Sequence, residues 1–149
     1  MNIECRGETV NIATGGVEVD RDLPPVVLLH GAGMDRTVWS QQTRYLAHHG
    51  FAAMAVDLPG HGESGGEPLS SIAEMADWVA EAITEIGLGP AHLVGHSMGS
   101  LISLEVAARH PEAVAPRMMV APIVSRRQTP LGIDGPAKLT TPDDQCLIK

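Results

Sequence analysis

The sequence predicts an α/β protein with a doubly wound, mostly parallel sheet. Residues 26–29, Val-Val-Leu-Leu, form an apolar run typical of a strand that helices bury on both faces. Strand patterns alternate with helix patterns along the first three quarters of the chain, an order that produces a parallel sheet. Glycine-rich polar motifs follow three of the strands, at the edge where such sheets carry their binding sites.

The first half of the chain predicts four strands and one helix. Four segments have strand composition and are bounded by turn residues: 3–5, 9–13, 26–29 and 51–56. The helix is predicted over residues 37–49, between the third and fourth strands. Asp35 can cap its first turn, and Gly50 ends it.

The second half predicts two longer helices and two strands. Ser71 and Glu74 have the spacing of a capping box, and apolar residues then recur at helical spacing until Gly87. This pattern predicts a helix over 72–86. The remaining predictions are a strand at 91–94, a helix at 97–110 and a strand within 114–124. The sheet therefore has strands up to about the sixth.

Composition excludes several classes of protein. The 149 residues suffice for one domain with a buried core, and the net charge of -8 disfavours nucleic acid as a partner. No apolar run approaches the ~20 residues of a membrane span. Cys5 and Cys146 are too few and too far apart for a disulfide framework or a zinc cluster. We expect no metal and no cofactor.

The N-terminus lacks a signal-peptide pattern, which indicates the cytoplasm. The oligomeric state is left open.

The composition changes near residue 116. Prolines recur at short intervals from there onward: Pro116, Pro122, Pro130, Pro136 and Pro142. No helix of normal length fits between them. The chain is therefore divided into a patterned core at 1–124 and an irregular, proline-rich tail at 125–149.

The strongest chemical signal is the motif GHSMG at residues 95–99, a Gly-x-Ser-x-Gly pattern between a predicted strand and a predicted helix. So tight a turn strains the serine backbone, and Gly95 and Gly99 remove the Cβ atoms that would clash. Ser97 then lies at a helix N-terminus, where the free Met98 N–H favours an oxyanion. We predict a nucleophilic serine; the alternative is a glycine-rich turn around a buried serine.

A second motif, His-Gly-Ala-Gly at residues 30–33, follows the first buried strand. Gly31 and Gly33 let this loop turn its backbone N–H groups inward. The Ala32 N–H would then be a second oxyanion donor, opposite Met98. His30 is expected to brace the loop. The alternative is an ordinary strand-to-helix turn.

A third motif, DLPGHGES at residues 57–64, follows the next parallel strand. Asp57 and His61 are residue types found in catalytic triads. We expect them instead to tie this loop by hydrogen bonds, because the Pro-Gly turn gives the segment a structural purpose.

In this order and spacing, HGAGMD, DLPGHGES and GHSMGS resemble the motifs of the α/β-hydrolase superfamily, over residue 1 to about residue 114. The serine makes the sequence similar to the esterase- and lipase-like branches with a serine nucleophile. These include esterases, monoglyceride-type lipases, thioesterases, carbon–carbon bond hydrolases and cofactor-free haloperoxidases. The resemblance implies hydrolysis of a small-molecule, ester-like acyl substrate without a cofactor. Ser97 would attack the carbonyl, and the N–H groups of Ala32 and Met98 would stabilise the oxyanion.

The chain departs from the family pattern after Ser97. The family's catalytic triad continues with an acid and then a histidine. The only histidine that follows is His110, ~20 Å away at the far end of the predicted helix. Asp134, Asp143 and Asp144 have no histidine after them. The resemblance therefore implies a truncated hydrolase core that lacks its last strands, and we expect the activity of this chain to be absent or impaired.

Three functional hypotheses remain open. The chain is a serine hydrolase that is inactive for want of a base, or an enzyme completed in trans by a second chain, or a binding protein that has lost the chemistry. Stoichiometric labelling by a fluorophosphonate would favour the second hypothesis.

Overall fold

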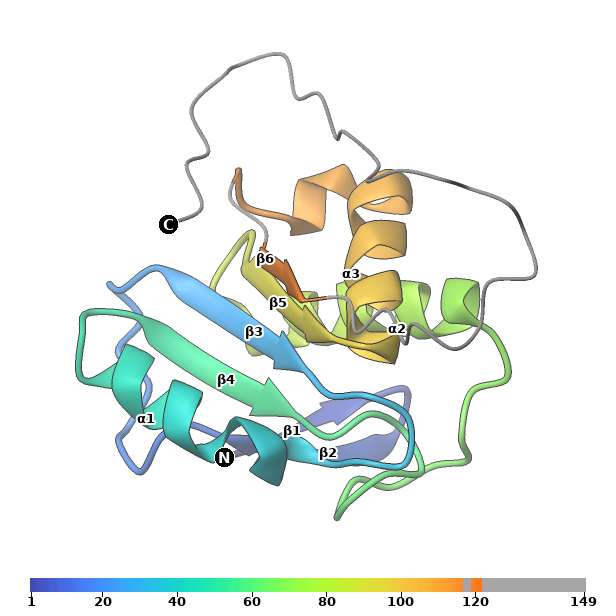
Figure 1. The fold of residues 1–149 in the computed structure, drawn as a ribbon, viewed down its shortest axis with the longest axis horizontal. Coiled ribbons are helices and arrows are strands. Elements are labelled where there is room, and N and C mark those ends of the chain that lie inside the picture. The colour runs from blue at the N-terminus through green and yellow to red at the C-terminus, as the bar shows by residue number, and fades with distance from the viewer. Residues whose placement is uncertain (117–118, 122–149) are drawn as a thin grey trace, which may run out of the picture.

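A computed structural model describes residues 1–116 and 119–121, and they form a six-stranded sheet with helices on both faces (Figure 1). The strand order is β1-β2-β4-β3-β5-β6. The strands are β1 (Asn2–Cys5), β2 (Glu8–Ala13), β3 (Pro25–Leu29), β4 (Ala52–Val56), β5 (His92–His96) and β6 (Met119–Ala121). The helices are α1 (Ser40–Ala47), α2 (Ile72–Ile86) and α3 (Met98–Arg109), with 3-10 turns η1 (Arg36–Trp39) and η2 (Pro111–Ala113).

The sheet is mostly parallel and doubly wound, as the sequence predicts. Strands β3, β4, β5 and β6 are parallel, whereas β1 and β2 pair antiparallel at one edge. The chain moves from β3 to β4 in one direction and then crosses back to β5 on the other side of β3. The order reverses between β3 and β5, and the carboxyl ends of the strands at such a reversal are where doubly wound sheets carry their binding sites.

Two hydrophobic cores lie on the two faces of the sheet. Val27 and Leu29 of β3 belong to the larger core, which the sheet shares with α2 and α3. Val26 and Leu28 belong to the smaller core on the α1 side, with Trp39. This alternation explains why residues 26–29 are apolar throughout, because both sides of the strand are covered.

Helix α2 follows its sequence signals closely. The Ser71 hydroxyl accepts a hydrogen bond from the Glu74 N–H at 3.2 Å, and Gly87 ends the helix in the left-handed conformation at φ 73°. The capping box is only half formed, however. The Glu74 carboxylate accepts from the Ser70 N–H at 3.1 Å rather than from the N–H of Ser71.

The helix predicted over 37–49 is the clearest local correction. Asp35 caps its start, accepting from the Thr37 N–H at 2.8 Å, but the first turn is the 3-10 turn η1 and the α-helix proper begins at Ser40. The 3-10 turn lets Trp39 enter the core on this face. In addition, β5 reaches His96, two residues beyond its predicted end. The tail predicted at 125–149 lies outside the described residues.

Candidate active site

The candidate site lies at the carboxyl ends of β3 and β5, where the strand order reverses. The two strands are hydrogen-bonded neighbours, and Leu29 pairs with Gly95 at their carboxyl ends. The loop after β3 holds residues 30–33, and the turn after β5 holds Ser97. Both motifs singled out by the sequence are therefore brought to one place.

Ser97 occupies a strained turn between β5 and α3. Its backbone has φ 54° and ψ -114°, and Arg6 is the only other non-glycine residue of the described segments with a positive φ. A conformation of this kind costs about 1–3 kcal/mol and persists only where the surrounding packing enforces it. The side chain is half-buried and makes no cap bond to the helix that follows, so its hydroxyl is left available.

Gly95 and Gly99 make this turn possible. A Cβ atom on Gly95 would overlap the carbonyl of Gly99. A Cβ atom on Gly99 would overlap the Leu29 carbonyl and lie 2.8 Å from the His30 carbonyl oxygen. The start of α3 therefore packs directly against the end of β3, which holds the two loops together.

The loop after β3 lies against the serine. A Cβ atom on Gly31 would be 3.4 Å from Ser97 Cβ. Gly33 has φ 67°, so the loop needs a glycine there. Among residues 1–116 and 119–121, neither the Ala32 N–H nor the Met98 N–H has a hydrogen-bond partner. Two unpaired backbone donors thus lie on the two loops that meet at Ser97.

His30 connects this loop to the loop after β4. The ring is fully buried. Its Nε2 accepts a hydrogen bond from the Leu58 N–H at 3.1 Å, and its Nδ1 is 2.8 Å from the carbonyl oxygen of Gly31. Burial lowers the pKa of His30, so the ring is neutral near pH 7. The structure agrees with the bracing role expected for this residue.

Asp57 is fully buried, and it joins its own loop to the turn η1 that follows β3. Its carboxylate accepts from the backbone N–H of Arg36 at 2.6 Å and of Glu63 at 2.9 Å, and it also pairs with the Arg36 guanidinium. A Cβ atom on Gly62 would overlap the same carboxylate. His61 bonds to the Pro59 carbonyl through Nδ1 at 2.9 Å. The hydrogen-bonding role predicted for Asp57 and His61 is what the structure shows.

His110 is held far from the site. It caps the opposite end of α3 from Ser97, and its Nε2 lies 2.6 Å from Asp77 Oδ1. Hydrogen bonds from Arg109 and then from His110 lower the pKa of Asp77 from 3.8 to about 2. Within the part of the chain that the structure describes, no side chain is hydrogen-bonded to the Ser97 hydroxyl.

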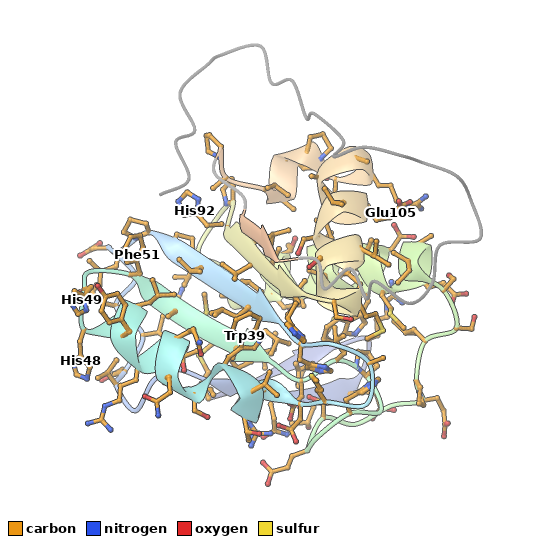
Figure 2. All side chains as sticks on the ribbon, in the orientation of Figure 1. Trp39, His48, His49, Phe51, His92 and Glu105 are labelled. Carbon is orange, nitrogen blue, oxygen red and sulfur yellow. The ribbon has the colours of Figure 1, made fainter. Side chains whose placement is uncertain are left out.

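One pair of buried polar atoms has no counterpart in the sequence analysis. The rings of Trp39 and His96 meet edge to face, with centroids 6.3 Å apart and planes at 84° (Figure 2 labels Trp39). Trp39 Nε1 and His96 Nδ1 are both buried without a hydrogen-bond partner among the described residues. Trp39 belongs to the smaller core on the α1 side of the sheet. The contact with His96 joins residues far apart in sequence, so no local pattern signals it.

The described residues contain neither a metal-binding cluster nor a membrane-spanning helix. None of their histidine, cysteine and acidic side chains cluster in threes in a way that could hold a metal ion. None of their helices is long and apolar enough to cross a membrane.

The strained serine lies between a parallel strand and a helix of a doubly wound sheet, and unpaired backbone donors lie beside it. This combination defines the class of α/β-hydrolase folds. The family model described as "alpha/beta hydrolase fold" matches residues 24–141, and the chain belongs to that family. The resemblance seen in the sequence is thereby confirmed.

Among the relatives of known activity are a hydrolase and an esterase. The chain is 39% identical over 104 residues to an (E)-2-((N-methylformamido)methylene)succinate hydrolase of Acinetobacter baylyi, covering 69% of this chain and 39% of the relative. It is 43% identical over 96 residues to a pimeloyl-[acyl-carrier protein] methyl ester esterase of Methylococcus capsulatus, covering 62% of this chain and 34% of the relative.

A solved structure shares the fold, and this chain again matches less than half of its length. The crystal structure of a membrane phospholipase A, described as a bacterial virulence factor, superposes with a TM-score of 0.73 at 30% identity. The match covers 86% of this chain and 41% of that chain. The chain thus spans well under half the length of the proteins it matches.

Proposed function

We propose that Ser97 is the nucleophile of a hydrolase that transfers the acyl group of a small, ester-like substrate to water. The observation that carries the proposal is the strained backbone of Ser97, which lies against the loop that holds the unpaired Ala32 N–H. The esterase among the relatives supports this substrate class.

The proposed reaction has two steps. Ser97 Oγ attacks the ester carbonyl carbon while a base removes its proton, and the carbonyl electrons move onto oxygen. The N–H groups of Ala32 and Met98 stabilise this oxyanion. The alcohol leaves with the proton, and water then cleaves the acyl-serine by the same route to release the acid and restore Ser97.

The base and its acidic partner are proposed to come from outside residues 1–149. His110, the only histidine after Ser97, is bound to Asp77 at the other end of α3. Without a base the serine is a weak nucleophile. The chain alone is expected to keep the ~10³–10⁴-fold contribution of the oxyanion hole and binding, and to lack full turnover.

Labelling with a fluorophosphonate, followed by peptide mass spectrometry, tests the proposal. We expect slow modification confined to Ser97, abolished in Ser97→Ala and unchanged in the matched control Ser40→Ala at the exposed start of α1. Fast, stoichiometric labelling of the purified chain would instead show that a base is supplied in trans. Modification that persists in Ser97→Ala would refute the assignment.

A further inference from the structure

The direction of the Ala32 N–H is set by the peptide group to which it belongs. This group joins Gly31 to Ala32, and it carries the Gly31 carbonyl at one end and the Ala32 N–H at the other. A trans peptide is planar, so its C=O and N–H point in opposite directions. No cis peptide occurs in the described chain. Whatever holds the Gly31 oxygen therefore also aims the Ala32 N–H.

Two donors hold the Gly31 oxygen. The Met34 N–H lies 3.2 Å from it and closes a turn within the loop. His30 Nδ1 lies 2.8 Å from it and is the closer of the two. The His30 ring is fully buried, so this bond is shielded from competing water.

The hydrogen bonds also fix which ring nitrogen carries the proton. The Leu58 N–H can only donate, so the His30 Nε2 that it meets at 3.1 Å must be unprotonated. The Gly31 oxygen can only accept, so Nδ1 must carry the proton. A single neutral tautomer satisfies both bonds, and the imidazolium would direct a second N–H against that of Leu58.

We propose that His30 is a positioning residue for the oxyanion hole: its Nδ1–H fixes the Gly31–Ala32 peptide and so keeps the Ala32 N–H aimed at the substrate oxygen. The ring does not touch the substrate. Its Nε2 anchors the arrangement to the backbone of Leu58, in the loop after β4. This inference rests on the proposed role of Ala32 and extends it to the residue that sets its geometry.

Two substitutions of His30 each remove the hydrogen bond of one ring nitrogen and keep that of the other. His30→Asn keeps an amide donor near the position of Nδ1 and loses the partner of Leu58. His30→Gln places its amide near the position of Nε2 and loses the bond to the Gly31 oxygen. Each removes one buried hydrogen bond, so the two variants should lose similar stability, seen as similar shifts of the urea midpoint. A purely structural role for the ring would affect both alike.

The orientation of the Ala32 N–H is measured directly by residual dipolar couplings in the nitrogen-15-labelled chain. We expect the Ala32 coupling to change in His30→Gln and to stay near the wild-type value in His30→Asn, while the couplings of β3 and β5 are unchanged in both. An Ala32 coupling that is unaltered in His30→Gln would overturn the proposal.

Ring nitrogen-15 shifts of the wild-type chain give a second readout that needs no variant. We expect a protonated Nδ1 and a bare Nε2 on His30. The opposite tautomer would overturn the proposal even if neither variant folds.

The rate at which Ser97 is labelled tests whether the orientation of the Ala32 N–H affects the reaction. Fluorophosphonate labelling of Ser97 should slow by about 10²-fold in His30→Gln and stay close to wild type in His30→Asn, because one oxyanion donor is worth about that much. If the wild-type serine does not react at all, the proposed function fails for this chain. The couplings and the tautomer still decide the role of His30 in that case.

Discussion

Gly99 has no side chain, and this lets the turn at Ser97 lie close to the loop of residues 30–33. In Gly99→Ala the new methyl group would overlap the Leu29 carbonyl, and backbone atoms cannot move aside cheaply. We expect a loss of about 3 kcal/mol in the free energy of unfolding. In the control Gly65→Ala the new methyl group meets only the flexible end of Glu8, at 2.7 Å, and should cost about 0.5 kcal/mol or less. Urea denaturation of both variants measures the difference, and equal midpoints would contradict it.

The buried ring of His30 also makes stability depend on pH. Burial lowers its pKa in the folded chain, with the nearby His61 acting in the same direction and Asp57 and Asp35 opposing it. In the unfolded chain a histidine has a pKa of about 6.5. Below that pH the unfolded chain therefore binds more protons at this residue than the folded chain does. Stability is complete above about pH 6.5 and falls as the pH drops toward the lowered value.

Urea unfolding at about pH 7.5 and about pH 5.5 tests this dependence. The wild-type chain should lose more stability between the two conditions than His30→Gln does. A His30→Gln variant with the same pH dependence as the wild type would show that His30 titrates normally.

At the scale of single elements, the sequence predicts best what is local. Short apolar runs predict the strands, the spacing of Ser71 and Glu74 predicts the start of α2, and two glycines predict the turn at Ser97. Each of these signals lies within a few residues of sequence. The 3-10 turn before α1 could not be predicted, because it depends on where Trp39 meets the sheet. The link from His30 to Leu58 spans 28 residues, so it too has no local pattern.

An ion pair joins Asp77, inside α2, to Arg109 at the end of α3, and it offers another test. Arg109 donates two hydrogen bonds of 3.0 Å to the Asp77 carboxylate, and with His110 it lowers the pKa of Asp77 to about 2. We expect Arg109→Gln to raise this pKa toward 3.8, as a carboxyl-carbon NMR titration would show. The control Arg44→Gln, at an exposed position on α1, should leave it unchanged.

The same pair contributes to stability only in a defined range of pH. The stabilisation from Asp77 is present above its ordinary pKa of 3.8 and is lost as the pH falls through about 2. Both side chains are partly exposed, so the effect on unfolding is small. An Asp77 titration that is the same with and without Arg109 would remove the ion pair from this account.

At the scale of the whole sheet, the helices among the described residues cover its two faces unequally. Helices α2 and α3 cover one face, whereas α1 covers the other mainly over β4 (Figure 1). An apolar groove of about 680 Å³ remains beside α1, lined by residues that include Val26, Leu28, Leu46 and Val94. Phe51, just before β4, and His92, the first residue of β5, also line it (Figure 2). The groove therefore runs along the α1 face and reaches the amino ends of these strands, whereas Ser97 follows the carboxyl end of β5.

Parallel sheets are normally covered on both faces, so this groove should bind apolar dyes while the chain is still folded. We expect an anilinonaphthalene sulfonate dye to bind well below the unfolding transition, and Leu46→Gln to weaken its affinity by about threefold or more through loss of apolar contact. Leu104→Gln is the matched control: Leu104 is also a helical leucine, 47% exposed, but it lies on α3 outside the groove. Fluorescence titration of the three proteins gives the affinities. If Leu104→Gln weakens binding as much as Leu46→Gln, the dye is reporting general apolar surface rather than the uncovered side of the sheet.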